Sequence, residues 1–237
     1  MGSSHSHSLH VHSASVGPMT DREPLHRTPE EVADDEEFFR WYGPWEPLDP
    51  DGLADFMAGF DRPWWIVGGW SIEAFTGVRR EHEDVDLTLL ACDLPAFRAH
   101  VGDRWNLWSN HGGTLRPFND RFPKVLDTSS QVWIRRSATD PWVVDLPITP
   151  DRDGLWTSKR DPDHVAPLED VTWVAESGIR YLRPEITLLY KAALHRPKDD
   201  RDLAVTWPLL DEDAGAWLRD TVARLYPDHA WLERLRR

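Results

Sequence analysis

The sequence predicts a mixed α/β front part followed by an all-helical back third. Before Arg183, short runs of β-branched and aliphatic residues alternate with segments of helical spacing. After Pro184, only helical spacing of the apolar residues remains. Strands and helices mixed along a chain are typical of a sheet with helices packed on it. Because strand patterns end near Arg183, we place the boundary between the two parts there.

The composition sets further limits. A chain of 237 residues has room for one domain or two small ones. The formal net charge of −14 argues against general nucleic-acid binding, which needs a basic face, and favours a cationic partner or a divalent metal. Because about 18 consecutive apolar residues are needed to cross a bilayer and no such run occurs, we expect no membrane association. The single cysteine, Cys92, fits a reducing compartment and predicts a cytoplasmic protein.

The N-terminal segment differs from the rest. Residues 1–18 are rich in Ser and His and lack both the charged start and the apolar run of a signal peptide. We interpret them as a disordered leader or tag, with Met19 as the expected start; a histidine metal cluster is the alternative. Residues 19–45 are predicted to form an acidic arm with a short helix near Glu30–Tyr42.

Local signals define the first helices and strand. Asp49 and Asp51 are candidate N-caps of a helix. The apolar run after Pro63 predicts a buried strand, and Gly77 is a candidate helix end. The predicted elements are a helix over Leu53–Phe60, a strand over Trp64–Val67 and a helix over Trp70–Phe75.

The remaining elements alternate and then become helical. Residues 105–127 contain strand-like fragments whose order stays open, and 151–163 read as a charged loop rich in turn formers. The other predicted elements are strands over Asp84–Leu90, Gln131–Arg135, Trp142–Leu146, Thr172–Ala175 and Gly178–Leu182, and helices over Leu94–Val101, Glu185–His195, Arg201–Leu210, Ala214–Tyr226 and His229–Arg237.

A pair of acids marks the strand that follows the glycine pair. Side chains two apart on a strand share a face, so Asp84 and Asp86 project together. Adjacent carboxylates repel unless a cation lies between them, and Mg²⁺ accepts carboxylates together with substrate phosphates. The alternative is an exposed strand face that carries two solvated acids.

Gly68 and Gly69 lie between a predicted strand and a helix start. Bare backbone N–H groups at such a position can hold phosphate, and the Ser71 hydroxyl lies at the same turn. In the alternative, this is a simple turn in which Ser71 caps its own helix. Followed by the acidic pair, the glycines predict a phosphate site beside a metal site.

These residues carry a family resemblance. Gly68-Gly69-Trp70-Ser71-Ile72-Glu73 and Arg80-Glu81-His82-Glu83-Asp84-Val85-Asp86 resemble the signature of the antibiotic nucleotidyltransferases, in the polymerase-beta-like superfamily. The segment is similar to the aminoglycoside 2″-adenylyltransferases and the lincosamide nucleotidyltransferases. It runs from about Trp64 to Leu90, more weakly to Asp145. Many relatives carry Asp in place of Glu73, whose charge suits a helix N-terminus.

The resemblance implies a nucleotidyltransferase fold with a small mixed sheet flanked by helices. We place this domain at 46–183 and the helical region at 184–237. It also implies two metal-binding aspartates, ATP or another nucleoside triphosphate, and a third acid on a later strand. Asp145 matches that position, alone in an apolar strand, where an acid is costly unless paired or functional. A buried salt bridge to Arg135 is the alternative.

Basic residues near the motif complete the candidate site. Thr187, Lys191 and His195 lie four apart on one predicted helix face, and Lys191 could reach the triphosphate. The alternative is a surface lysine on an amphipathic helix. Arg80 either clamps phosphate or neutralises neighbouring glutamates, and His82 is expected to order the loop.

The expected reaction is transfer of AMP from ATP to a hydroxyl of a small, cationic, aminoglycoside-like acceptor. In this reaction Gly68, Gly69 and Ser71 would hold the phosphates. Asp84, Asp86 and Asp145 would bind Mg²⁺, and Asp145 would also accept the proton of the acceptor hydroxyl. Two alternatives remain open: a toxin-type nucleotidyltransferase that modifies tRNA or protein, and a non-catalytic nucleotide-binding protein. The negative charge disfavours RNA, and the intact motif set disfavours the second alternative.

Overall fold

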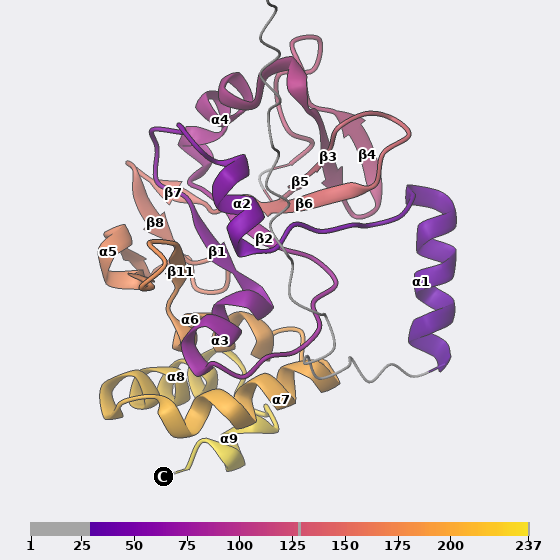
Figure 1. Cartoon of the computed structure of the whole chain (residues 1–237). Helices are drawn as coiled ribbons and strands as arrows, with labels where there is room; N and C mark the ends of the chain where they lie inside the picture. The colour runs from indigo at the N-terminus through magenta and orange to yellow at the C-terminus, as the bar shows by residue number, and fades with distance from the viewer. Residues whose placement is uncertain (1–28, 128, 237) are drawn as a thin grey trace, which may run out of the picture.

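The computed structural model describes residues 29–127 and 129–236. The predicted leader and residues 19–28 of the predicted arm lie outside them. An eight-stranded mixed sheet forms the centre, with the C-terminal helices gathered at one end (Figure 1). The mixed α/β fold with flanking helices is therefore confirmed. None of the helices in the described ranges is long and apolar enough to cross a membrane.

The central sheet has the strand order β10-β11-β1-β2-β6-β5-β3-β4. The pairs β1–β11 and β2–β6 are parallel and the other pairs antiparallel. A separate small antiparallel sheet has the order β7-β8-β9. The strands are β1 (Trp65–Val67), β2 (Asp86–Thr88), β3 (Asn106–His111), β4 (Thr114–Pro117), β5 (Gln131–Arg135), β6 (Trp142–Pro147), β7 (Asp151–Arg152), β8 (Leu155–Thr157), β9 (Val165–Ala166), β10 (Thr172–Val174) and β11 (Arg180–Leu182).

Capping residues mark the start or the end of several helices. Asp49 accepts the Gly52 N–H at 2.8 Å ahead of α2, and Asp211 accepts that of Ala214 at 2.8 Å ahead of α8. Gly77 ends α3 in the left-handed conformation. The helices are α1 (Pro29–Tyr42), α2 (Pro50–Phe56), α3 (Gly68–Thr76), α4 (Leu94–Val101), α5 (Leu168–Val171), α6 (Pro184–Ala192), α7 (Pro197–Thr206), α8 (Glu212–Leu225) and α9 (Trp231–Arg234), with short 3₁₀ turns at Ala91–Asp93, Gly102–Arg104 and Trp207–Leu209.

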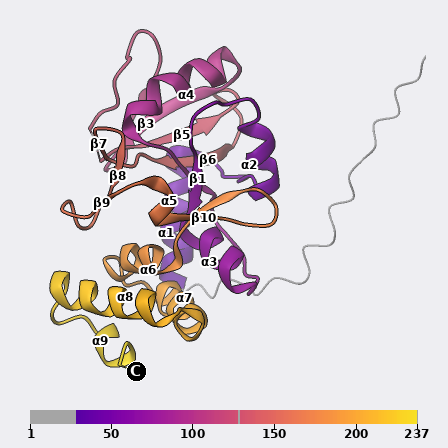
Figure 2. The same cartoon turned by 90° about the vertical axis from the view of Figure 1, so that its left-hand side faces the viewer.

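Among the described residues there are three buried hydrophobic clusters, and two of them divide the molecule between sheet and helices. The first joins one face of the sheet to α2 and α4, and its members include the fully buried Leu87 and Phe97. The second lies among α6, α7, α8 and α9 and receives Ile72 from α3. Figures 1 and 2 show α3 between the sheet and the C-terminal helices. Because α3 contacts both α6 and α7, it connects the sheet to the helical end of the fold.

Most predicted elements are confirmed, with local corrections. The strand expected over Asp84–Leu90 is limited to β2, and α3 begins at Gly68 rather than at Trp70. The segment 151–163, expected to be a loop because it is rich in turn formers, contains the paired strands β7 and β8. His195 lies beyond the end of α6 with a φ of 47°, so it does not share the helix face of Lys191.

Helix α1 is joined to the sheet by aromatic side chains. Phe38 packs against Trp133 of β5 with ring centroids 5.7 Å apart, and Tyr42 packs against the same indole at 5.8 Å. The Tyr42 hydroxyl donates to the Gly113 carbonyl at 2.8 Å. These contacts hold α1 at the side of the sheet (Figure 1).

Candidate active site

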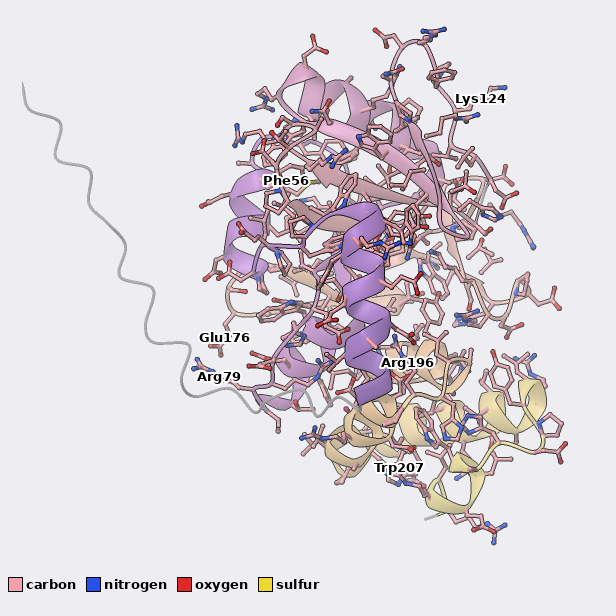
Figure 3. All side chains as sticks on the ribbon, turned by 90° about the vertical axis from the view of Figure 1, so that its right-hand side faces the viewer. Phe56, Arg79, Lys124, Glu176, Arg196 and Trp207 are labelled. Carbon is pink, nitrogen blue, oxygen red and sulfur yellow. The ribbon has the colours of Figure 1, made fainter. Side chains whose placement is uncertain are left out.

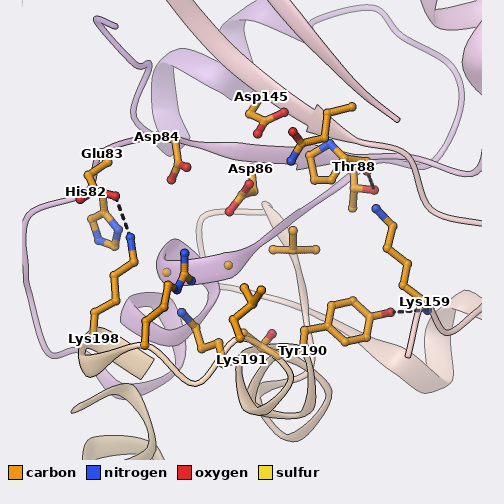
Figure 4. A pocket seen from close by; sticks show the side chains of 18 of the residues that line it. His82, Glu83, Asp84, Asp86, Thr88, Asp145, Lys159, Tyr190, Lys191 and Lys198 are labelled. Carbon is orange, nitrogen blue, oxygen red and sulfur yellow. Dashed lines mark hydrogen bonds and ion pairs between the residues drawn. The ribbon is translucent and has the colours of Figure 1, made fainter. Parts of the chain in front are cut away.

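Strand pairing places two aspartates next to each other. Asp86 of β2 and Asp145 of β6 are direct partners in a parallel pair. Their sequence neighbours Leu87 and Leu146 point into the sheet core. Because side chains alternate along a strand, both carboxylates project from the opposite face. Asp84, two residues before Asp86, joins them, and one carboxylate oxygen from each lies within 4.8 Å of the others (Figure 4).

Burial makes this group of carboxylates costly when it is fully ionised. Asp145 is only 7% exposed. Burial, together with the charges of Asp86 and Asp84, raises the pKa of Asp145 well above its ordinary value. Burial and the charge of Asp84 raise the pKa of Asp86 to about 7. A cation between the three groups would remove both penalties.

The donor atoms fit a hard divalent cation. The Oδ1 atom of Asp145 is buried and has no hydrogen-bond partner among the described residues. Buried polar atoms are normally satisfied, so this oxygen needs a partner. Carboxylate oxygens alone make up the set, which is the chemistry that Mg²⁺ selects, with substrate phosphate completing its coordination. Asp84, Asp86 and Asp145 therefore form a candidate magnesium site.

Two glycines occupy the first two positions of α3, beside the carboxylates. Gly68 has a φ of 71°, and a Cβ there would collide with the Asp86 carboxylate. A Cβ on Gly69 would collide with the Arg80 guanidinium and lie 2.8 Å from Nδ1 of His82. The pair thus lets the start of α3 approach the acids closely. The first backbone N–H groups of a helix have no intrahelical partner and attract anions, so a phosphate can bind here.

Ser71 takes a different position from the one expected. Its side chain is fully buried and does not line the pocket. The hydroxyl lies 2.9 Å from the Gly68 carbonyl and 2.9 Å from the Thr187 hydroxyl. Ser71 therefore makes no direct contact with a phosphate in this geometry. The alternative, in which Ser71 caps its own helix, does not occur either, because α3 has no side-chain cap. Ser71 instead ties the start of α3 to α6.

Basic side chains line the wall that faces the carboxylates. Lys191 lies 2.7 Å from Asp202 and 3.2 Å from Asp199, and it is only 5% exposed. The interpretation of Lys191 as a surface lysine is therefore wrong. Arg80 contacts the same Asp202 at 3.2 Å, and Lys198 contacts Glu83 at 2.7 Å. The cationic side chains of this wall are thus each held by an acid, of which Glu83 lines the pocket as well.

A further network fixes the loop that carries Asp84. Glu73 accepts the Arg80 N–H at 3.2 Å and lies 2.7 Å from Nε2 of His82. The His82 ring stacks on Trp70 at a centroid distance of 3.9 Å, and the Trp70 indole donates to the Asp84 carbonyl at 3.1 Å. The prediction that His82 orders this loop is confirmed. Glu73 also holds this loop, a role that goes beyond the expected one of a negative charge at a helix N-terminus.

The predicted alternative for Asp145 does not occur. Arg135 is paired with Trp142 across the strands, whereas Asp145 is paired with Trp133. The Arg135 guanidinium lies over the Trp142 ring at 4.1 Å, and no ion pair joins it to Asp145 in the described ranges. Asp145 is therefore not a structural salt-bridge partner of this arginine.

One comparison supports the family resemblance over part of the chain. Residues 52–101 match the family model described as aminoglycoside-2″-adenylyltransferase. The resemblance to the antibiotic nucleotidyltransferases is confirmed. With it, the expectation of a nucleotidyltransferase enzyme is confirmed as well. The matched segment runs from α2 to α4 and contains the glycine pair, Asp84 and Asp86.

The structure is similar to the solution structure of the antibiotic-resistance factor ANT(2″)-Ia, with 17% sequence identity and a TM-score of 0.45. The similarity covers 75% of this chain and 89% of that chain. A search of curated proteins finds no match.

The pocket that holds the three carboxylates contains residues that the sequence analysis does not predict. Its volume is about 300 Å³, and it is lined by Lys159, Arg160, Tyr190 and Arg196 besides the predicted residues Gly68, Gly69, Arg80, Asp84, Asp86, Asp145 and Lys191. Lys159 follows β8 in a segment that the sequence presents only as a charged loop. Burial lowers its pKa to about 8. No periodicity or motif marks it, because only the folded chain brings this loop to the carboxylates.

Proposed function

We propose that the protein is a magnesium-dependent nucleotidyltransferase that moves AMP from ATP to a hydroxyl of a small cationic acceptor of the aminoglycoside type. One observation carries the proposal: three carboxylates lie within 4.8 Å of one another beside a helix start opened by two glycines. This arrangement supports a divalent-metal site beside a phosphate site in one pocket.

The pocket residues have distinct proposed roles. Asp84, Asp86 and Asp145 would hold Mg²⁺, which when bound neutralises charge on the phosphate oxygens. The N–H groups at Gly68 and Gly69 receive the β- and γ-phosphates, and two cationic side chains that line the pocket, Arg80 and Lys191, compensate their charge.

The reaction is a substitution at the α-phosphorus. The acceptor oxygen forms a bond to this phosphorus while the bond to the bridging oxygen of the β-phosphate breaks, and pyrophosphate leaves with both electrons of that bond. Asp145 accepts the hydroxyl proton on the carboxylate oxygen that does not hold the metal, since its carboxylate lines the same pocket.

Two observations support the choice of acceptor. The family model that matches residues 52–101 is named for aminoglycoside 2″-adenylylation. The chain's net charge of −14 attracts a polycationic, hydroxyl-rich compound and repels RNA. The single cysteine is exposed and free, in keeping with a reaction in a reducing compartment such as the cytoplasm.

The test is nucleotide transfer by the purified protein. ATP and Mg²⁺ are incubated with a panel of aminoglycosides, and pyrophosphate release is followed alongside the acceptor mass, which should increase by one AMP. Asp86→Asn should abolish both signals, whereas Asp55→Asn, at an exposed position of α2, should leave them unchanged. Transfer that continues in Asp86→Asn, or wild-type protein that transfers nothing to any acceptor in the panel, would overturn the proposal.

A further inference from the structure

The distribution of lysines is uneven. The chain has four lysines, Lys124, Lys159, Lys191 and Lys198. All but Lys124 line the pocket. In a chain with a large excess of acids, this concentration points to an anion that binds in the pocket.

Two of the three pocket lysines already have acidic partners in the protein. Lys191 is paired with Asp199 and Asp202, and Lys198 with Glu83. Lys159 has no acidic group within 4.0 Å among the described residues, although it lies mostly buried in the same pocket. Its charge is therefore incompletely compensated, and burial of such a charge is unfavourable until an anion arrives.

Lys159 occupies its own side of the pocket. Figure 4 shows Asp86 between Lys159 on one side and Lys191 and Lys198 on the other. The acids whose charges act most on its ammonium group are Asp145 and Asp86. An anion that extends from the cationic wall across Asp86 would therefore reach Lys159 beside Asp145.

The backbone around Lys159 is held by the C-terminal helices. Its N–H donates to the Tyr190 hydroxyl of α6 at 3.2 Å. The Ser158 hydroxyl accepts the N–H groups of Arg160 and Asp161, each at 3.2 Å. Asp161 in turn is paired with Arg224 of α8. A loop fastened at these points presents the lysine in a defined place rather than as a free surface chain.

We infer that Lys159 is a nucleotide-binding residue that contacts the transferred α-phosphoryl group on the Asp145 side of the pocket. The inference rests on the proposed function, which supplies a triphosphate as the anion. Lysine suits this role as a compact charge with three donors for phosphate oxygens. Contact with the reacting group means that its loss affects the rate as well as nucleotide affinity.

Three variants test the inference. Lys159→Met removes the charge at nearly constant length, and Lys159→Arg keeps the charge. The matched control is Lys124→Met, at an exposed site far from the pocket residue Arg196 (Figure 3). Binding of ATP is measured by calorimetry with EDTA at 0.1 and about 0.5 M salt, because salt screens long-range attraction but much less a buried contact. Turnover is then measured with Mg²⁺ and the acceptor.

Lys159→Met should weaken metal-free ATP binding about tenfold or more at both salt concentrations, and it should lower kcat about 10²-fold, as does loss of one donor to a reacting group. Lys159→Arg should keep part of both values, and Lys124→Met should match wild type in both. None of the three variants should melt below the wild type. Affinity and kcat within twofold of wild type in Lys159→Met would overturn the inference. A loss of ATP affinity that disappears at high salt would also overturn the inference, because it would show that Lys159 attracts ATP only through long-range electrostatics.

The two proposals fail in different ways. If wild-type protein transfers nucleotide but Lys159→Met does so equally well, only the assignment of Lys159 is wrong. If wild-type protein binds ATP through Lys159 but releases no pyrophosphate with any acceptor, the proposed function is wrong and so is the contact with a transferred group.

Discussion

Asp86 and Asp145 are direct partners across two parallel strands, although 58 residues separate them in the sequence. The pairing brings two carboxylates to the same side of the sheet, and Asp84 adds a third. Each raises the energy of ionising the others, so the arrangement is unfavourable for the isolated protein and favourable for a protein that binds a divalent cation.

Asp86→Asn should separate stability from activity. Removing one of three repelling acids relieves electrostatic strain, so we expect an unchanged or higher melting temperature in the absence of metal. Pyrophosphate release should fall to background because a metal ligand is lost. Calorimetric titration with Mg²⁺ checks the cause directly: unaltered Mg²⁺ affinity in this variant would contradict the site.

Asp145→Asn should lower kcat about 10²–10⁴-fold, the usual cost of losing a general base. Metal-free ATP binding should be largely kept, since the amide preserves the shape of the side chain. The measurement is steady-state kinetics beside a melting curve. A large fall in melting temperature with kcat within a few-fold of wild type would instead assign Asp145 a purely structural role.

Gly68→Ala should lose both stability and activity, and Gly154→Ala should lose only stability. Both glycines have positive φ values, 71° and 80°, so alanine strains the backbone at either position by about 1–3 kcal/mol. Only at Gly68 would the new Cβ meet the Asp86 carboxylate, because Gly154 has open space around it. Chemical denaturation and turnover are measured for both. Equal losses of activity would show that the close approach at Gly68 is unimportant.

The acceptor KM should rise steeply with added salt, while the KM for ATP should change less. A polycation approaching a protein of net charge −14 is attracted over a Debye length of about 10 Å at 0.1 M salt. Initial rates between about 0.05 and 0.5 M salt give both constants. An acceptor KM that does not depend on salt would count against an aminoglycoside and for an uncharged hydroxyl compound.

The value of kcat/KM for ATP should decline as the pH rises past about 8. Burial lowers the pKa of Lys159 to about 8, so its ammonium group is charged below this pH and neutral above it, and only the charged form attracts phosphate. In Lys159→Arg the decline should move to higher pH, because arginine stays protonated. A decline at the same pH in both proteins would assign it to another group.

The part of the site that the sequence predicts is the part with local patterns. Asp86 follows from strand alternation, and Gly68 and Gly69 from their place after an apolar strand. Asp84, expected on the same strand as Asp86, lies on the loop before β2, yet its carboxylate still joins the group. Asp145 is recognisable as a single acid in an apolar strand, although its pairing with Asp86 depends on a strand order that no local pattern encodes.

The residues that sequence reasoning missed depend on contacts over long distances. Lys159 reaches the pocket because Tyr190 and Arg224, from two later helices, fasten its loop. Ser71 appears from the sequence to be a phosphate ligand, yet its hydroxyl turns toward Thr187, which is 116 residues away. Local periodicity does not report which helix packs over a turn, so these roles emerge only from the tertiary structure.

The shared carboxylate of Asp202 has a consequence for dividing the chain. It accepts Arg80 from the loop after α3 and Lys191 from α6 at the same time. A fragment that ends near Arg183 would retain the motif but lose Asp202, Asp199 and Lys191, and Arg80 would lose the ion pair that orients it. The change from strands to helices along the sequence is thus a poor place to cut. A fragment that keeps this wall of the pocket would have to include α7.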